Sequence, residues 1–221
     1  MRKSKDGSKH ITDEKINSIT HLVGAILSVL AVAILIVQAS LQKDVTKIVS
    51  FSLYGFSLFS LFLFSTLHHS INSSSRVEKV LKVLDYNAVF LLIAGTITPL
   101  SLIVLTGALG WTFFGVIWIL AIIGISLKSI NPHLPKWVTN TFYITMGWLG
   151  FFLAISLFDK ISLNALYLLA FGGILYSVGF AIYTKEWPNL IKGKFGFHEI
   201  WHILVLVAAG LHWLMYYLYV L

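Results

Sequence analysis

Two histidines stand close together near the end of the chain, in a pattern that suits metal binding. His198 and His202 are four residues apart with Glu199 between them, in the order H-E-x-x-H. In a helix this spacing puts two side chains on one face, about 40° apart and one turn apart in height, so both imidazoles can reach one ion. Ser65 and His69 repeat the spacing earlier in the chain. The sequence has no cysteine, so a transition metal can be held only by His, Asp or Glu.

The elements that must position these groups are membrane spans. The chain has 221 residues, of which 57% are hydrophobic and 11% are charged, a composition typical of a polytopic membrane protein. Seven apolar runs approach the ~20 residues that a spanning helix needs. They cover 20–40, 48–68, 84–105, 110–127, 137–157, 163–184 and 198–221. We therefore predict an all-α integral membrane protein, with a polar segment at 1–19 and a seven-helix bundle at 20–221.

The basic residues predict how the bundle is oriented. All lysines and arginines except Lys43, Lys47 and Lys160 fall on the side of the N-terminus. The positive-inside rule makes that side cytoplasmic, and an odd number of spans puts the C-terminus outside. The net charge of +7 is thus sorted by topology and does not indicate a nucleic-acid partner. The first run lacks a small-residue cleavage site, so we expect it to be retained as a helix.

On this topology the polar groups meet at one depth. His69 ends the second run, Asp85 opens the third, and His198 and His202 open the seventh. Ionisable groups inside spans are costly and normally face the bundle interior with a partner, so four of them at one level predict a metal site.

Other interpretations of single residues remain open. Asp85 could instead cap the third helix. His68 lies about 100° round the helix from His69 and is expected to face lipid headgroups or a neighbouring helix. His212 lies deeper, at a position that favours a buried hydrogen-bonding residue. Gly172, Gly173 and Gly179 predict close helix packing.

H-E-x-x-H is also the zinc motif of metalloproteases, in which the glutamate is the general base. Here the motif opens the last run, and no further helix follows to supply the second catalytic element that intramembrane proteases carry. An intramembrane metalloprotease is therefore the less favoured alternative. On this view Glu199 is incidental, and Glu199→Gln should do little.

A resemblance covers almost the whole chain. Its pieces are E-K-I-N-S-I-T-H (Glu14 to His21), S-T-L-H-H (Ser65 to His69), L-D-Y-N (Leu84 to Asn87), A-G-T-I-T-P (Ala94 to Pro99), H-E-I-W-H (His198 to His202) and L-H-W (Leu211 to Trp213). In order and separation they resemble the progestin and adipoQ receptor superfamily, and specifically its bacterial hemolysin III branch. One departure is His68, where that branch commonly has tyrosine.

The resemblance implies a multi-pass protein of the bacterial plasma membrane that holds Zn²⁺. The ligands would be His69, His198 and His202, with water in the fourth position hydrogen-bonded by the catalytic residues Asp85 and Ser65. The supporting residues it implies around that site are Glu14, Asn17, His21 and His212.

Three neutral ligands with an open position are typical of catalytic zinc. We therefore expect a zinc-dependent hydrolase that acts on an amide or ester of a membrane lipid, with that lipid as its partner. The alternatives are a non-enzymatic regulator of membrane lipid or energy homeostasis with structural zinc, and a cytolysin. Pore formation normally needs a secreted or convertible protein, so seven retained helices favour lysis only as a side effect of overexpression.

Overall fold

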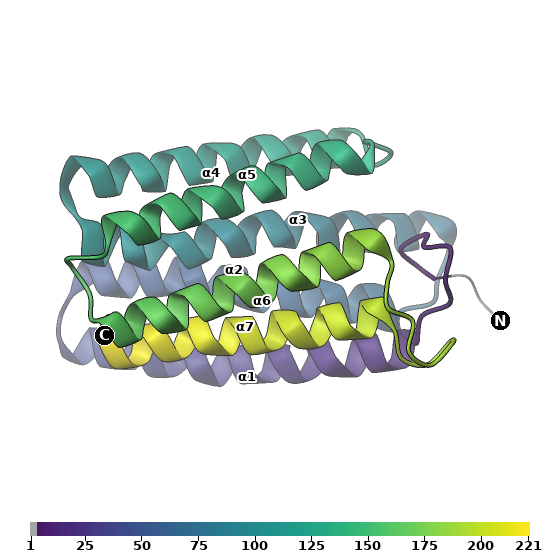
Figure 1. The fold of residues 1–221 in the computed structure, drawn as a ribbon, viewed down its shortest axis with the longest axis horizontal. Helices are drawn as coiled ribbons and strands as arrows, with labels where there is room; N and C mark the ends of the chain where they lie inside the picture. The colour runs from purple at the N-terminus through teal and green to yellow at the C-terminus, as the bar shows by residue number, and fades with distance from the viewer. Residues whose placement is uncertain (1–3) are drawn as a thin grey trace.

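A bundle of long helices forms the whole of the described chain, residues 4–221 of the computed structural model (Figure 1). Seven of these helices are long and apolar enough to cross a membrane, as predicted, and no strand occurs between residues 4 and 221. In chain order they are α1 (Glu14–Leu41), α2 (Val45–Ser70), α3 (Ser75–Pro99), the π-helical η1 (Leu100–Leu105), α4 (Gly107–Ile130), α5 (Lys136–Ser156), α6 (Leu163–Lys185) and α7 (Phe197–Tyr219).

Two helices begin well before their apolar runs. The side chain of Asp13 accepts hydrogen bonds from the amides of Lys15 and Ile16, which starts α1 at Glu14. Helix α3 begins at Ser75, so Asp85 lies inside this helix, about 15 Å from its first residue. The predictions that Asp85 opens or caps the third helix are therefore wrong. A helix begins where its first turn is capped and not where hydropathy rises, so polar turns extend these spans.

Helices α1, α2 and α3 pack side by side in chain order, and α7 packs against both α1 and α6. Helices α4 and α5 form an outer layer over α3. The most buried spans are α2 and α3, whereas α4, α5 and α6 expose large apolar side chains such as Trp111, Ile144 and Phe171. This arrangement puts polar side chains of α2, α3 and α7 inside the bundle and leaves apolar faces for lipid.

Glycine allows close packing between α6 and α7. A Cβ at Gly172 would lie 2.3 Å from Nε2 of His212, and one at Gly179 would lie 2.7 Å from the ring of Trp201. Both therefore serve the predicted close approach of helices. Gly173 does not, because nothing lies within 4 Å of a Cβ built there.

The segment before α1 folds back over one end of the bundle, at the right in Figure 1. Nζ of Lys5 donates to the carbonyls of His68 and Ile71, at 2.9 and 2.6 Å, and so caps the end of α2. Ser8 donates to the Glu186 carboxylate at 3.0 Å, just beyond α6. The chain ends lie at opposite ends of the bundle (Figure 1).

Candidate metal centre

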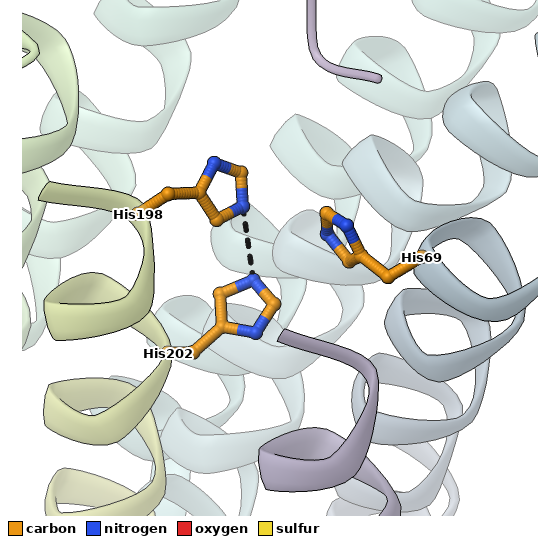
Figure 2. A group of neighbouring side chains, drawn as sticks. All are labelled: His69, His198 and His202. Atoms are coloured by element: carbon orange, nitrogen blue, oxygen red, sulfur yellow. Dashed lines mark hydrogen bonds between the residues drawn. The ribbon is translucent and has the colours of Figure 1, made fainter. Parts of the chain in front are cut away.

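Three buried histidines from two helices converge at the end of the bundle that the N-terminal segment covers. His198 and His202 lie one turn apart on α7, and His69 faces them from the last turn of α2 (Figure 2). One ring nitrogen from each lies within 4.8 Å of the others. The Nε2 atoms of His198 and His202 are 3.1 Å apart. The buried cluster is of a kind that could hold a metal ion.

Acceptors behind two of the rings fix which nitrogen carries the proton. Nδ1 of His202 lies 3.1 Å from the carbonyl oxygen of Asn17, and Nδ1 of His69 lies 2.5 Å from Oε2 of Glu14. Carbonyl and carboxylate oxygens accept, so Nδ1 donates in both rings and Nε2 keeps its lone pair. A carboxylate or carbonyl behind a histidine is the usual support of a metal ligand, because it orients the ring and raises its basicity.

Asp6 supports the third ring. Its Oδ2 lies 3.0 Å from Nδ1 of His198, a close electrostatic contact without the angle of a hydrogen bond. Its Oδ1 lies 3.1 Å from Nε2 of His68. Burial tends to raise the pKa of Asp6, but the neighbouring His198 and His68 outweigh it and hold that pKa below its ordinary range. Asp6 therefore faces His198 as an anion.

The Nε2 lone pairs of the three histidines are arranged so that one bound cation would satisfy them. Because the carbonyl takes the proton of His202 at Nδ1, and Asp6 favours the same tautomer in His198, their Nε2 lone pairs face each other at 3.1 Å. Nε2 of His69 is buried and has no hydrogen-bond partner in the described chain. A shared proton could relieve the first pair, but it would leave the third nitrogen unsatisfied. One metal ion satisfies all three.

The predicted catalytic residues lie beside this cluster. Asp85, on α3, has a carboxylate oxygen within 4.8 Å of ligand atoms of Asp6, His68 and His69. Ser65 lies one turn before His69, with its hydroxyl beside Asp85 but outside hydrogen-bond geometry. The hydroxyl and the carboxylate are therefore free to meet a ligand.

Helix α1 brings three of the four predicted supporting residues to the histidines. Glu14 and Asn17 hold His69 and His202, as described above. His21, one turn further along α1, stacks on His202 with ring centroids 3.7 Å apart and 13° between planes. Both nitrogens of His21 are buried without a hydrogen-bond partner among residues 4–221.

Glu199 binds backbone and not the cluster. Its Oε2 accepts from the amide of Gly196 at 2.8 Å. Its Oε1 accepts from the amide of Asp13 at 2.7 Å and from Nδ2 of Asn17 at 3.2 Å. Both oxygens are thus used to join the start of α7 to the start of α1, which leaves no role as a general base. This side chain is buried and fully engaged, so it joins two helix starts, and the expectation that Glu199→Gln does little to turnover stays a prediction.

His212 lies elsewhere. Its Nε2 contacts the carbonyl oxygen of Leu169 on α6 at 3.1 Å, and its ring lies beside Tyr176. Ten residues beyond His202, it is about 15 Å further along α7. The structure therefore keeps it apart from the residues that surround the cluster.

Two residues of the site escaped sequence reasoning. His68 is 2% exposed, contacts Asp6 and lies within 4.8 Å of a carboxylate oxygen of Asp85. Of the two expectations for His68, it faces a neighbouring helix, α3, and not lipid headgroups. Asp6 had no signal in its own neighbourhood, since it lies in a polar segment outside any apolar run. Glu14 was found because it belongs to a motif of the family that the chain resembles, and Asp6 lies outside that motif. No periodic pattern connects a residue of this segment to histidines so far along the chain.

Fold and site together define a multi-pass helical membrane protein with a buried, metal-competent histidine cluster. A sequence model of the haemolysin-III related family matches residues 9–213, and the chain belongs to that family. It is 42% identical over 214 residues to hemolysin-3 of Bacillus cereus, covering 97% of this chain and 94% of that protein. It is 39% identical over 201 residues to a hemolysin-3 homolog of Bacillus subtilis (strain 168), covering 90% and 91%.

A more distant similarity reaches animals. The chain is 26% identical over 177 residues to the human monocyte to macrophage differentiation factor, covering 78% of this chain and 71% of that protein. These similarities confirm the predicted resemblance to the hemolysin III branch of the progestin and adipoQ receptor superfamily. With seven apolar helices, they assign the chain to the bacterial cell membrane as a multi-pass protein.

Proposed function

We propose that the chain is a zinc-dependent hydrolase that cleaves an amide or ester bond of a membrane lipid. One observation carries the proposal. Three buried histidine nitrogens with available lone pairs converge, and Asp85, a carboxylate that no described residue holds in a salt bridge, lies beside one of these histidines, His69.

The donor set suits zinc. Zn²⁺ accepts histidine nitrogen at about 2.0–2.1 Å, so two ligands of a tetrahedral ion lie about 3.3 Å apart. The Nε2 atoms of His198 and His202, at 3.1 Å, are close to that separation. Zinc sites with three protein ligands keep an open position, which is the catalytic pattern.

When bound, zinc would make water acidic near neutral pH and polarise a carbonyl group. The chain supplies the rest of the chemistry. Asp85 would accept the proton of the attacking water and return it to the leaving nitrogen or oxygen, and Ser65 would hydrogen-bond that water. Glu14 and Asn17 would hold two of the ligand rings in place.

The position of the cluster supports a lipid substrate. His69 is in the last turn of α2 and His198 is in the first turn of α7, so the cluster lies at the end of two apolar spans. An ester or amide at the boundary between headgroup and acyl chain lies at this depth in a bilayer.

A second function has an observation in its favour. Asp6 reaches Nδ1 of His198 from a segment that covers the cluster, and a shift of this carboxylate from Nδ1 to the metal would make it a fourth protein ligand. Four protein ligands are typical of a closed, structural zinc site. In that case the protein would be a membrane regulator without hydrolase activity.

Metal analysis, together with one variant of the proposed catalytic residue, tests both the hydrolase function and the structural zinc function. We expect about one zinc ion per chain in detergent-purified protein, consistent with a single closed or catalytic site. Asp85→Asn should keep the zinc and abolish release of fatty acid from a panel of lipid amides and esters. Zinc with no hydrolysis by either protein would favour the structural function, and absence of zinc from unchelated, folded protein would exclude both. Because two relatives are named hemolysin-3, red-cell lysis at native expression levels should be measured in parallel.

A further inference from the structure

Lysines from three helices line two cavities at the same end of the bundle as the histidines. Lys82 on α3, Lys128 at the end of α4 and Lys136 at the start of α5 line a cavity of about 210 Å³. A second cavity of about 310 Å³ is lined by Lys79 and again by Lys82 and Lys128. The two cavities therefore share a pair of ammonium groups.

Lys128 is buried and has no carboxylate partner. It is 7% exposed, its Nζ donates among the described residues only to the carbonyl of Pro132 at 3.3 Å, and it lies 4.8 Å from the centroid of the Tyr86 ring. No salt bridge joins it to an acidic side chain within residues 4–221. The charges that act on it are the ammonium groups of Lys82 and Lys136, which repel it. A buried cation among like charges is costly unless an anion joins it.

The acidic groups nearby are already engaged or lie at the rim. Glu78 lines the larger cavity and accepts from the amide of Ser73 at 3.4 Å. Glu186 lies 4.0 Å from Lys136, whose side chain is 60% exposed. Asp6 and Asp85 act on Lys82 from a distance, and Asp6 is held by His68 and His198. The pair of ammonium groups shared by the cavities thus has an excess of positive charge.

A chain of contacts connects this charge to the histidines. Lys82 and Lys128 both lie over the ring of Tyr86, at 5.9 and 4.8 Å from its centroid. The hydroxyl of Tyr86 lies 3.0 Å from that of Tyr183, which donates to Asp6 at 3.4 Å. Asp6 in turn contacts His198 and lines the smaller cavity. A ligand in this cavity would therefore lie next to the candidate metal centre.

We propose that Lys82 and Lys128 form a binding site for a phosphate group, with Lys136 at its rim. Phosphate carries one to two negative charges and accepts hydrogen bonds on several oxygens, which suits two or three ammonium groups around a small cavity. On a phospholipid, the phosphate would anchor the headgroup while the acyl linkage reaches the histidines. That catalytic role rests on the proposed hydrolase function, but the phosphate site itself does not.

The test uses the full chain in detergent and measures retained ligands by native mass spectrometry. The probes are phosphatidic acid, neutral diacylglycerol of the same acyl length, and inorganic phosphate. The variants are Lys82→Gln, Lys128→Gln and the charge-conserving Lys128→Arg, with Lys160→Gln as control. Lys160 is an exposed lysine in the connection between α5 and α6, and this connection lies at the opposite end of the bundle (Figure 1). Zinc content is measured on every sample.

We expect phosphatidic acid to bind and diacylglycerol not to bind. Affinity for phosphatidic acid should fall at least tenfold in Lys82→Gln and Lys128→Gln, recover in Lys128→Arg, and stay unchanged in Lys160→Gln. Binding of inorganic phosphate alone, with the same dependence on the lysines, would support the site with a soluble ligand as its source.

Equal retention of phosphatidic acid by Lys82→Gln and Lys160→Gln would overturn the proposal, even if Lys128→Gln failed to fold. Failure of the hydrolase proposal would look different. It would show as absent zinc or absent turnover in protein whose phosphate binding still depends on Lys82.

Discussion

Two of the three buried histidines of helix α7, His202 and His212, lie in opposite settings. His202 turns Nδ1 toward the carbonyl oxygen of Asn17 and leaves Nε2 among other histidines. His212 turns Nε2 toward the carbonyl oxygen of Leu169 and leaves Nδ1 buried without a partner among residues 4–221. The two residues are similarly buried, at 2% and 5% exposed.

Burial alone therefore does not make a histidine a candidate ligand. A single carbonyl selects the tautomer in each ring, and the tautomer decides which lone pair is available. At His202 that lone pair meets two others, whereas at His212 it faces no other ligand group. The comparison predicts that metal binding belongs to one end of α7 only.

The largest expected effect is on zinc content, and it distinguishes the cluster histidines from His212. The double substitution His198→Ala/His202→Ala removes two of three ligands and should reduce bound zinc to background. His212→Asn should leave the zinc content at the wild-type level, because no contact joins His212 to the cluster. Elemental analysis of the purified proteins, beside thermal unfolding to show that each is folded, measures both. Loss of zinc in His212→Asn would break the distinction between the two ends of α7.

The ligand end of α7 could be predicted from sequence because its signals are local. The spacing from His198 to His202, and from Ser65 to His69, fixes a shared helix face, and hydropathy gives the spans. Asp6 could not be found in this way, because its contact with His198 joins a polar terminal segment to the last helix. The burial of Lys128 could not be predicted from the sequence either, because a lysine at the end of a span usually extends its ammonium group to water.

A second prediction concerns the support behind a ligand. Glu14 lies 2.5 Å from Nδ1 of His69 and raises the basicity of that ring. Glu14→Ala should weaken zinc affinity about 10–100-fold without removing a ligand. Competition with a chelator of known affinity measures this, with Glu78→Gln as the matched carboxylate control on α3. Unchanged affinity would show that the carboxylate behind His69 only closes the site to water.

Glu199 should matter for folding and not for metal. In Glu199→Gln, one carboxylate oxygen becomes an amide NH₂ that cannot accept from Gly196, Asp13 or Asn17. Leaving such buried donors unpaired costs about 1–3 kcal/mol. We expect a lower thermal unfolding midpoint at saturating zinc with unchanged zinc stoichiometry. Loss of hydrolysis at full stability would instead make Glu199 the base, as in a metalloprotease.

The smallest predicted effect tests the other end of α7. In Gly172→Ala, the new methyl group would lie 2.3 Å from Nε2 of His212. That ring cannot move away without losing its contact with Leu169, so we expect a loss of about 1–3 kcal/mol from overpacking. Gly173→Ala is the matched control, because nothing lies within 4 Å of its Cβ and alanine favours a helix over glycine by up to about 1 kcal/mol. Opposite shifts in thermal midpoint with zinc content unchanged would show that the packing of His212 stabilises the bundle independently of the metal centre. Equal shifts would mean that α6 and α7 can separate at this point, and that close contact with Gly172 does not hold His212 in place.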